Sequence, residues 1–302
     1  MDFDFSVGGL SEELSSKKSY EVDERFYVLP KDEKGNGAAL IRFLPSEFVK
    51  NGSKTEIVTI FKAFKYNIRS PFSKAFYAYW SPSSIGLKDP AQDRWAKLWN
   101  EGKKDEARAF ARQERVIANI QVVNDIKNPE NNGKVFLLDM SKTFAQKVVS
   151  WADPSAQERA LGTTPKEIFN PTKSFLVKYV ASVGANGFTN YDKSEVVEGG
   201  SPLAATPEEA VKFIQENCYK LSEWKSASAY PSYDEIEGKI NNLMTPGGTG
   251  ETAQPAAAAP SAAPFEPDQP ATPAQSAQPA QPTTEVSSAE VSDLDTLIAS
   301  LS

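Results

Sequence analysis

The stretch from Ile57 to Lys88 contains neither aspartate nor glutamate over 32 residues. It carries five cations, Lys62, Lys65, Arg69, Lys74 and Lys88. Between them lie eight aromatic rings, Phe61, Phe64, Tyr66, Phe72, Phe76, Tyr77, Tyr79 and Trp80. Cations displace the counterions of phosphates, and aromatic faces stack on unpaired bases whatever the base is. The pattern therefore predicts a surface for single-stranded nucleic acid.

The same rings have a second interpretation, because strands rich in aromatic residues also fill protein cores. A strand has two faces, so it is improbable that all eight rings point inward. We place Tyr66, Tyr77, Tyr79 and Trp80 among the predicted stacking residues. Arg42, Arg112 and Arg115 are predicted to add phosphate contacts or guanidinium stacking.

Catalysis is not favoured, because the chain has no histidine and one cysteine, Cys218. Serine–histidine and cysteine–histidine catalysis and zinc sites of cysteine and histidine are excluded. Carboxylate–metal or lysine chemistry remains. The candidate acids Asp125, Asp139, Asp153 and Asp192 lack metal-ligand spacing and are interpreted as turn and cap residues. We therefore predict a binding protein and not an enzyme.

The elements expected to position these residues alternate between strands and helices. Strands are predicted at 25–29, 38–45, 56–64, 72–80, 117–123, 135–139 and 174–183. Two helical pieces are predicted within 89–115, with Trp95, Leu98 and Trp99 on one face, followed by helices at 143–151, 207–221 and 233–243. Thr206 is the expected N-cap of the helix at 207–221.

The ends of the chain differ in character from its body. Residues 247–302 hold seven acidic residues and no basic one, which accounts for the whole net charge of −7. We predict an N-terminal arm at 1–19, a core at 20–245 with a helical insertion at about 87–115, a Pro/Ala/Gln-rich linker at 246–288 and an acidic-apolar tail at 289–302. No apolar run is long enough for a membrane span.

The predicted fold class is α+β, an OB-fold-like β-barrel core with a helical insertion and C-terminal helices, followed by a disordered acidic tail. Several short strands interrupted by helices favour this architecture. A disordered tail that only keeps the protein in solution is the alternative to a tail that binds partners.

Four segments carry a resemblance to a known family. They are Asn36–Ser46, Ala118–Phe136 (its ends Ala118–Val123 and Pro129–Phe136), Gly187–Asp192 and Asp293–Leu297, in the family's order and at about its spacing. Through them the chain resembles the single-stranded-DNA-binding protein of T-even-type bacteriophages, the gene 32 product. The resemblance covers roughly residues 20–245 and the tail.

The resemblance implies a cleft that binds single-stranded DNA during phage replication, recombination and repair, in the cytoplasm of the infected bacterial host. It carries over Arg42, Arg112, Phe188 and Tyr191 as DNA-binding residues. It also implies a tail that contacts replication and recombination proteins and shields the cleft. We assign that role to Asp293, Leu294, Asp295, Leu297 and Ile298. Self-association on DNA is a further expectation.

Two departures from the family are visible in the sequence. The best-known members bind a structural zinc through one histidine and three cysteines in the insertion, and here the insertion has none of these residues. We expect no cofactor and no metal, with Trp95, Leu98 and Trp99 forming an apolar core in place of the zinc. The family's arm is basic, whereas this arm is net acidic with only Lys17 and Lys18.

Two other classes of function stay open at this point. A scaffold that acts through its tail without touching DNA predicts no change in protein fluorescence on adding an oligonucleotide. A metal-dependent nuclease predicts cleavage of DNA stimulated by Mg²⁺. The single-strand binder is our main prediction.

Overall fold

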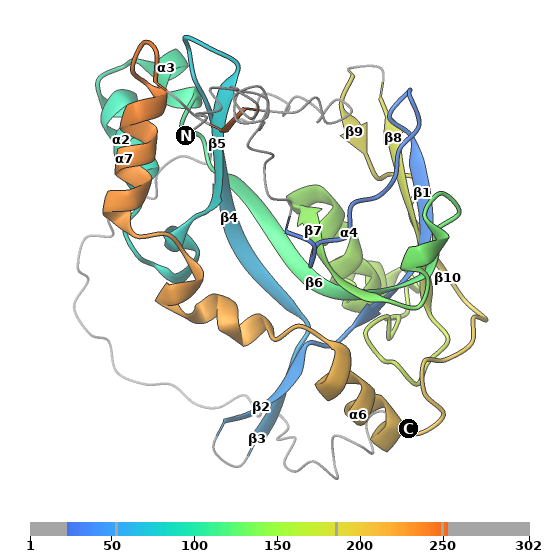
Figure 1. The fold of residues 1–302 in the computed structure, drawn as a ribbon. Helices are drawn as coiled ribbons and strands as arrows, with labels where there is room; N and C mark the ends of the chain where they lie inside the picture. Colours follow the sequence, from blue (N-terminus) through green and yellow to red (C-terminus); the bar gives the residue numbers. More distant parts are fainter. Residues whose placement is uncertain (1–22, 52–53, 185–186, 249–250, 253–302) are drawn as a thin grey trace, which may run out of the picture. The chain divides into compact units, whose positions relative to one another are not determined.

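The computed structural model describes residues 23–51, 54–184, 187–248 and 251–252. The chain forms two compact units. Within the described ranges, unit 1 contains residues 23–24, 64–113, 230–248 and 251–252, and unit 2 contains residues 25–63 and 114–229. The ribbon in Figure 1 shows the elements of each unit. No helix in the described ranges is long and apolar enough to cross a lipid bilayer.

Unit 2 is built on antiparallel strands. Its sheet runs in the order β10 (Glu195–Val197), β8 (Leu176–Val183), β1 (Gly37–Leu44) and β6 (Gln113–Asn124), with β7 (Val135–Ser141) on β6 and β9 (Thr189–Asn190) on β8. A separate two-stranded ribbon consists of β2 (Glu47–Asn51) and β3 (Lys54–Val58). The register between β1 and β6 shifts at Leu40/Ile41, an irregularity that bends β1.

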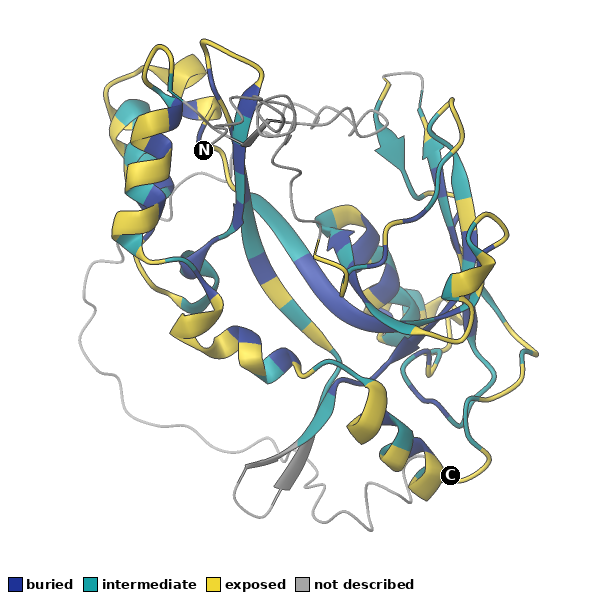
Figure 2. Cartoon of the chain, in the orientation of Figure 1, coloured by how far each residue is buried: buried dark blue, intermediate teal, exposed yellow. Residues whose placement is uncertain are grey.

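The core of unit 2 lies between these strands and helix α4 (Lys142–Ala152). Ile41 and Phe43 from β1 and Ile120 from β6 are almost fully buried there with Phe144 and Val148 of α4. Figure 2 shows the buried positions along β6 as a dark stretch. Alternating apolar residues on the strands therefore meet one apolar helix face.

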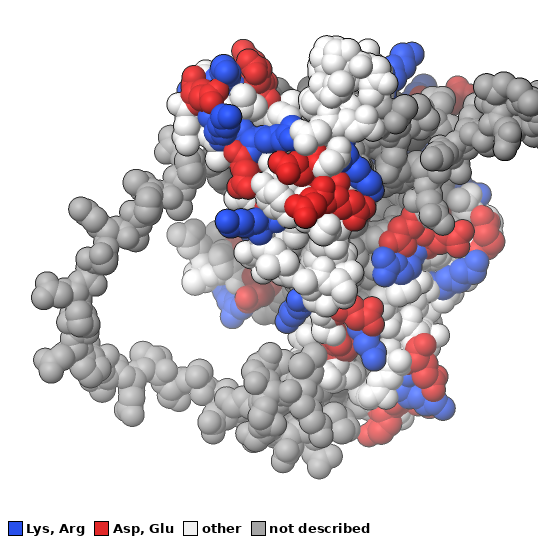
Figure 3. Space-filling view, turned by 60° about the vertical axis from the view of Figure 1, so that its left-hand side comes forward, with Lys and Arg blue, Asp and Glu red and all other residues white. Residues whose placement is uncertain are grey.

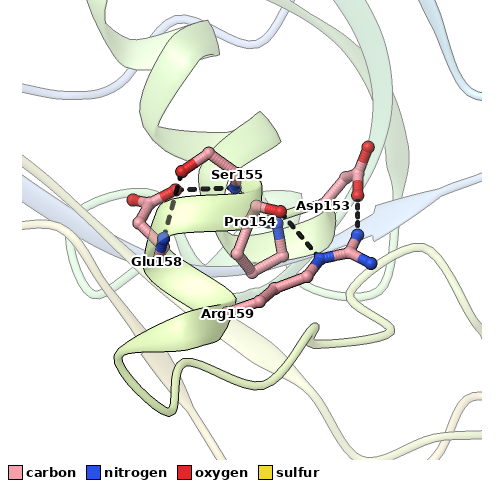
Figure 4. A network of polar contacts seen from close by, with 5 residues as sticks. All are labelled: Asp153, Pro154, Ser155, Glu158 and Arg159. Carbon is pink, nitrogen blue, oxygen red and sulfur yellow. Dashed lines mark hydrogen bonds and ion pairs between the residues drawn. The ribbon is translucent and has the colours of Figure 1, made fainter.

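The junction between α4 and the short helix α5 (Ala156–Ala160) is closed by local polar contacts (Figure 4). Ser155 and Glu158 form a reciprocal capping box, with Ser155 N donating to Glu158 Oε2 over 2.8 Å. Arg159 Nε donates to the carbonyl of Pro154 over 2.8 Å, and its guanidinium also pairs with Asp153. Asp153 is therefore paired with Arg159 at the end of α4.

A buried asparagine fastens the C-terminal part of unit 2 to β6. Asn119 donates to the carbonyl of Tyr219 over 2.8 Å and accepts from the amide of Tyr219 over 3.0 Å. This contact follows α6 (Pro207–Asn217) and precedes the 3₁₀ turns η3 (Leu221–Lys225) and η4 (Ala227–Ala229). The remaining 3₁₀ turn of unit 2 is η2 (Pro129–Asn131).

Unit 1 combines a hairpin with helices. Strand β4 (Ile60–Arg69) begins in unit 2 and enters unit 1 at Phe64, where it pairs with β5 (Ala75–Trp80), which in turn pairs with β11 (Glu251–Thr252). The turn η1 (Pro82–Ile85) leads to α2 (Pro90–Asn100) and α3 (Lys104–Arg108), and α7 (Tyr233–Leu243) contacts both α2 and β5.

The sequence predictions agree with most of these elements. The strands at 38–45, 117–123, 135–139 and 174–183 and the helices at 143–151 and 233–243 are confirmed, and Thr206 is the N-cap of α6 in a full capping box. The structure is mixed α/β with an antiparallel sheet, as predicted in outline.

Several bounds were wrong. The strand predicted over 56–64 is divided, because β3 ends at Val58 and β4 runs from Ile60 to Arg69, and the strand predicted over 72–80 begins at Ala75. The second helical piece, predicted over 105–115, ends at Arg108, because β6, whose apolar and β-branched run starts at Val116, already begins at Gln113. The helix predicted to reach Leu221 ends at Asn217. Residues 25–29 lie extended with an isolated bridge from Phe26 to Leu137 and form no strand.

Candidate single-strand interface

The β4–β5 hairpin of unit 1 separates its side chains into two faces. The antiparallel register pairs Lys65 with Trp80, Asn67 with Ala78 and Arg69 with Phe76. These six residues, which we call the outer face, are all exposed or half-buried. Since side chains alternate along a strand, one side of the hairpin presents two aromatic rings, each directly opposite a cation.

The opposite side, the inner face, is core. Tyr66, Tyr77 and Tyr79 are only 1%, 5% and 6% exposed, and they pack with Ile68 and with Ile236 and Ile240 of α7. Tyr77 and Tyr79 are stacked with ring centroids 4.8 Å apart. Their ring faces are covered by side chains of the same unit. The three tyrosines that we predicted as stacking residues therefore support the hairpin in this structure and do not present a face to a base.

The cations of the hairpin lie beside rings. Lys65 Nζ is 4.7 Å from the centroid of the Trp80 ring. Where β4 enters unit 1, Arg112 lies over the ring of Phe64. The Arg112 Cζ is 4.0 Å from the ring centroid, and Arg112 is exposed. Such cation–π contacts hold a charge next to an aromatic face, so phosphate and base contacts fall side by side.

The tip of the hairpin adds one exposed ring and one exposed cation. Phe72 is 56% exposed, and Lys74 is exposed two residues further on. Within the described ranges, neither Arg69 nor Lys74 makes an ion pair with a carboxylate. Their charge is therefore available to a phosphate.

A buried carboxylate anchors helix α2 to the hairpin. Asp89 is 1% exposed and accepts hydrogen bonds from Tyr79 Oη over 2.9 Å, from Ser81 Oγ and from the amide of Ala91 over 2.8 Å. It is the N-cap of α2, with Pro90 in the first turn. Burial and the neighbouring Asp89 charge raise the pKa of Tyr79 above its ordinary value, so the hydroxyl stays a donor.

Helix α2 and α7 complete the core of unit 1. Trp95 and Leu98 pack against the buried cluster of Tyr66, Phe110 and Ile240. Trp99 stacks on Trp95 with ring centroids 5.2 Å apart. The predicted shared face of the three residues on one helix is confirmed. It contributes to a larger core than predicted, since β4, β5 and α7 share it.

The predicted DNA-binding residues of unit 2 lie in a different setting. Arg42 is 6% exposed, donates from Nη1 to Gln121 Oε1 over 2.7 Å and donates from Nη2 to the carbonyl of Ser201. Burial lowers the pKa of Arg42. Its guanidinium therefore holds the loop around Ser201 against β1 and β6.

Lys62 and Arg115 both have carboxylate partners. Lys62 Nζ is 3.1 Å from Glu114 Oε1, and Lys142 Nζ is 3.4 Å from Glu114 Oε2. Arg115 Nε donates to Asp139 Oδ1 over 2.5 Å and its Nη2 donates to the Asp139 carbonyl over 3.0 Å. These cations are partly neutralised within the protein.

Phe188 and Tyr191 are half-buried. Tyr191 stacks on Tyr179 with ring centroids 5.0 Å apart and an interplanar angle of 4°, and it also contacts Phe144 of the core. One face of Tyr191 is thus occupied by protein. The predicted tail residues Asp293, Leu294, Asp295, Leu297 and Ile298, and the arm at 1–19, lie outside the described residues.

Three of the four candidate acids are engaged in local structure, and the fourth, Asp192, is exposed. Asp125 accepts from Tyr27 Oη over 2.8 Å and from the amides of Lys127 and Asn128. Asp139 and Asp153 pair with arginines, as described above. Among the described residues no group of three or more histidine, cysteine, aspartate or glutamate side chains is placed to hold a metal ion. Burial raises the pKa of Cys218 to about 12, so its thiol stays protonated.

At least one face of the protein carries acidic as well as basic side chains. On the face drawn in Figure 3, Lys and Arg side chains are interspersed with Asp and Glu. A mixed face of this kind favours solubility and gives no continuous attraction for a polyanion. The contrast makes the acid-free outer face of the hairpin the stronger candidate.

Sequence reasoning left out three outer-face and tip residues, Asn67, Phe72 and Phe76. The signal was present in the strand parity, because Phe76 lies four residues before Trp80 and hence on the same face of β5. Parity also puts Trp80 on the opposite face from Tyr77 and Tyr79, but parity alone does not tell which of the two faces is buried.

A strand face of rings and cations is typical of a protein that binds single strands without base specificity. Comparison with known proteins agrees with this class. Residues 35–244 match the family model described as gp32 DNA binding protein like. The chain therefore belongs to this family, whose members are non-enzymatic binding proteins.

Two curated relatives support the assignment. The single-stranded DNA-binding protein of Enterobacteria phage T4 is 30% identical over 251 residues, covering 80% of this chain and 78% of the relative. The single-stranded DNA-binding protein of Enterobacteria phage T2 is 30% identical over 238 residues, covering 76% and 74%. The predicted resemblance is thereby confirmed.

Proposed function

We propose that this protein binds single-stranded DNA through the outer face of the β4–β5 hairpin, without strong dependence on sequence. Trp80 and Phe76 stack on bases, while Lys65 and Arg69 contact the phosphates on either side. Arg112 and Lys74 extend the positive charge beyond the hairpin. The names of the T4 and T2 relatives support single-stranded DNA as the ligand.

The observation that carries this proposal is the pairing across the hairpin. Both outer-face rings lie directly opposite a cation, and all the tyrosines of these two strands are buried on the other side. A core-only role for the aromatic residues would not place Trp80 and Phe76 beside Lys65 and Arg69. The binder is thus favoured over a scaffold whose body does not touch DNA.

The test is a salt-titrated binding assay with a labelled single-stranded oligonucleotide and a duplex of the same length. We expect tighter binding to the single strand, quenching of tryptophan fluorescence, and an affinity that falls as salt rises. A protein that shows no quenching and no binding at low salt would have the scaffold function instead. Cleavage of the oligonucleotide in Mg²⁺ would indicate a nuclease.

Membership of the family supports a more specific proposal for the biological role. We propose that the protein coats and protects single-stranded DNA during phage replication, recombination and repair in the infected cell. In this proposal unit 2 is an OB-type β-barrel. In unit 2, DNA displaces the present protein partners of five further side chains and is bound by them. These are Arg42, Lys62, Arg115, Phe188 and Tyr191.

The acidic tail is proposed to recruit replication partners and to shield the binding surface when DNA is absent. Its charge supports this, since residues 247–302 carry the entire net charge of −7. Deleting 247–302 is expected to strengthen single-strand affinity at low salt, with a gain that shrinks as salt rises. An unchanged affinity at both salt levels would remove the shielding role.

We propose that unit 1 folds without the zinc of the best-known family members. The chain has no histidine, and its one cysteine lies in unit 2, so the residues present do not fit that site. The buried cluster around Tyr66, Phe110 and Ile240 and the Asp89 hydrogen bonds support the helices instead. Stoichiometric zinc in the purified protein, measured by elemental analysis, would contradict this.

A further inference from the structure

The outer face contains a gap between its two rings. Trp80 and Phe76 are four residues apart on β5, which separates them by about 13 Å along the strand at the usual rise. Ala78 lies midway, and its partner across the hairpin is Asn67. The smallest side chain of the face therefore stands between the two largest, and an amide stands beside it.

The amide of Asn67 is available for a ligand. Asn67 is exposed, and in the described part of the chain its side chain has no hydrogen-bond partner. Of the six outer-face residues, Asn67 alone carries a neutral side chain with both a donor and an acceptor. Lys65 and Arg69 flank it on β4 at the two nearest same-face positions, where they are placed to hold the phosphates of one nucleotide and its neighbour.

Resting on the proposed function, we infer that this gap is a single-nucleotide subsite in which Asn67 hydrogen-bonds to the edge of an unpaired base. Trp80 and Phe76 stack on the flanking bases, and Ala78 leaves room for the base between them. The Watson–Crick edge of every unpaired base presents a donor next to an acceptor, which matches the amide of asparagine. The subsite adds a hydrogen bond to the edge of a base. The rest of the surface contacts only the faces of bases and the phosphates.

This assignment separates base contacts from backbone contacts. Asn67→Ala removes an interaction with the base, whereas Lys65→Ala removes one with the phosphate. An abasic oligonucleotide retains the phosphates and lacks every base edge, so it distinguishes the two. The variant Asn124→Ala, at an exposed asparagine that ends β6 in unit 2, is the matched control.

The experiment measures fluorescence anisotropy of a labelled single strand and of its abasic counterpart with full-length protein. For Asn67→Ala we expect an affinity loss of about two- to tenfold for the base-containing strand, the range of one net hydrogen bond, and no loss for the abasic strand. Lys65→Ala is expected to weaken both, and Asn124→Ala neither. Asn67→Asp keeps the size of the side chain, loses the donor and adds a negative charge, so it is expected to weaken binding of both strands, and of the base-containing strand more.

Equal losses of Asn67→Ala on both strands, or no loss on either, would overturn the subsite and leave the proposed function intact. Failure of the wild-type protein to bind either strand would instead overturn the proposed function itself. Circular dichroism of each variant establishes that it is folded, and Asn67 is exposed, so its replacement by alanine leaves the core unchanged.

Discussion

The hairpin of unit 1 and the basic residues of unit 2 were predicted from the same kind of evidence, yet they differ in what surrounds each cation. Arg69 and Lys74 have no carboxylate partner among the described residues. In unit 2, Lys62 and Arg115 pair with Glu114 and Asp139, and Arg42 is buried against Gln121. The paired cations must exchange a protein partner for a phosphate, whereas Arg69 and Lys74 have no such partner to lose among the described residues.

The two faces of the hairpin provide a second form of the same comparison. The outer face presents Trp80 and Phe76, whereas the inner face buries the tyrosines against α2 and α7. Substitutions on the outer face should change binding and leave stability nearly intact. Substitutions on the inner face should do the reverse.

The largest effect is expected for Asp89→Ala. It leaves the buried donors of Tyr79 and Ser81 and the Ala91 amide without their acceptor, which should lower the free energy of unfolding by about 3 kcal/mol. Thermal and urea denaturation followed by circular dichroism measure the loss. The control Asp105→Ala, at an exposed aspartate of α3, should change stability by less than about 0.5 kcal/mol. Equal stability of the two variants would mean that Asp89 does not hold the hairpin.

Trp80→Ala should have the largest effect on binding. Loss of one stacked base is worth about 1–3 kcal/mol of affinity. Trp99→Ala is the matched control, because Trp99 lies on α2 and stacks on Trp95 instead of facing outward from the hairpin. Anisotropy with a labelled single strand measures both variants. If both lost the same affinity, the ring at position 80 would have no special role.

Tyr79→Phe examines the inner face. It removes the hydroxyl that donates to Asp89 and keeps the ring, so we expect a loss of about 1 kcal/mol in unfolding free energy. Single-strand affinity should not change. A fall in affinity without a fall in stability would place Tyr79 in the interface after all.

Glu114→Gln tests the internal partners of unit 2. Burial alone would raise the pKa of Glu114, but hydrogen bonds and charges from Lys62 and Lys142 outweigh it and leave the pKa below its ordinary value. Its contribution to stability is thus present above the unfolded-state pKa and is lost as the pH falls through the lower folded-state pKa. The glutamine variant should therefore show a flatter acid side in its stability profile.

The same substitution removes an acidic neighbour of Lys62 and Lys142. Single-strand affinity at low salt should rise by about two- to threefold, because two cations lose a competing carboxylate. An unchanged affinity would mean that these lysines do not approach the DNA even when that pair is broken.

Much of this structure could be predicted from the sequence, because its signals are local. Apolar alternation located β8, a turn before it and a proline after it located β1, and the Thr206 capping pattern located α6. The acid-free stretch located the hairpin. What remained out of reach was which face of β5 is buried, since Tyr77 and Tyr79 lie on one face and Trp80 on the other, and packing against α2 and α7, which are distant in sequence, decides between them. Partners distant in sequence, such as Asp139 for Arg115, were equally invisible.

The most direct measurement is the salt dependence of single-strand affinity for the wild-type protein and for Lys65→Ala/Arg69→Ala. If these outer-face cations contact two phosphates, the slope of log affinity against log salt concentration should become shallower by about 1.4 in the double variant. A slope equal to that of the wild type would contradict the claim that the outer face of the hairpin binds the strand.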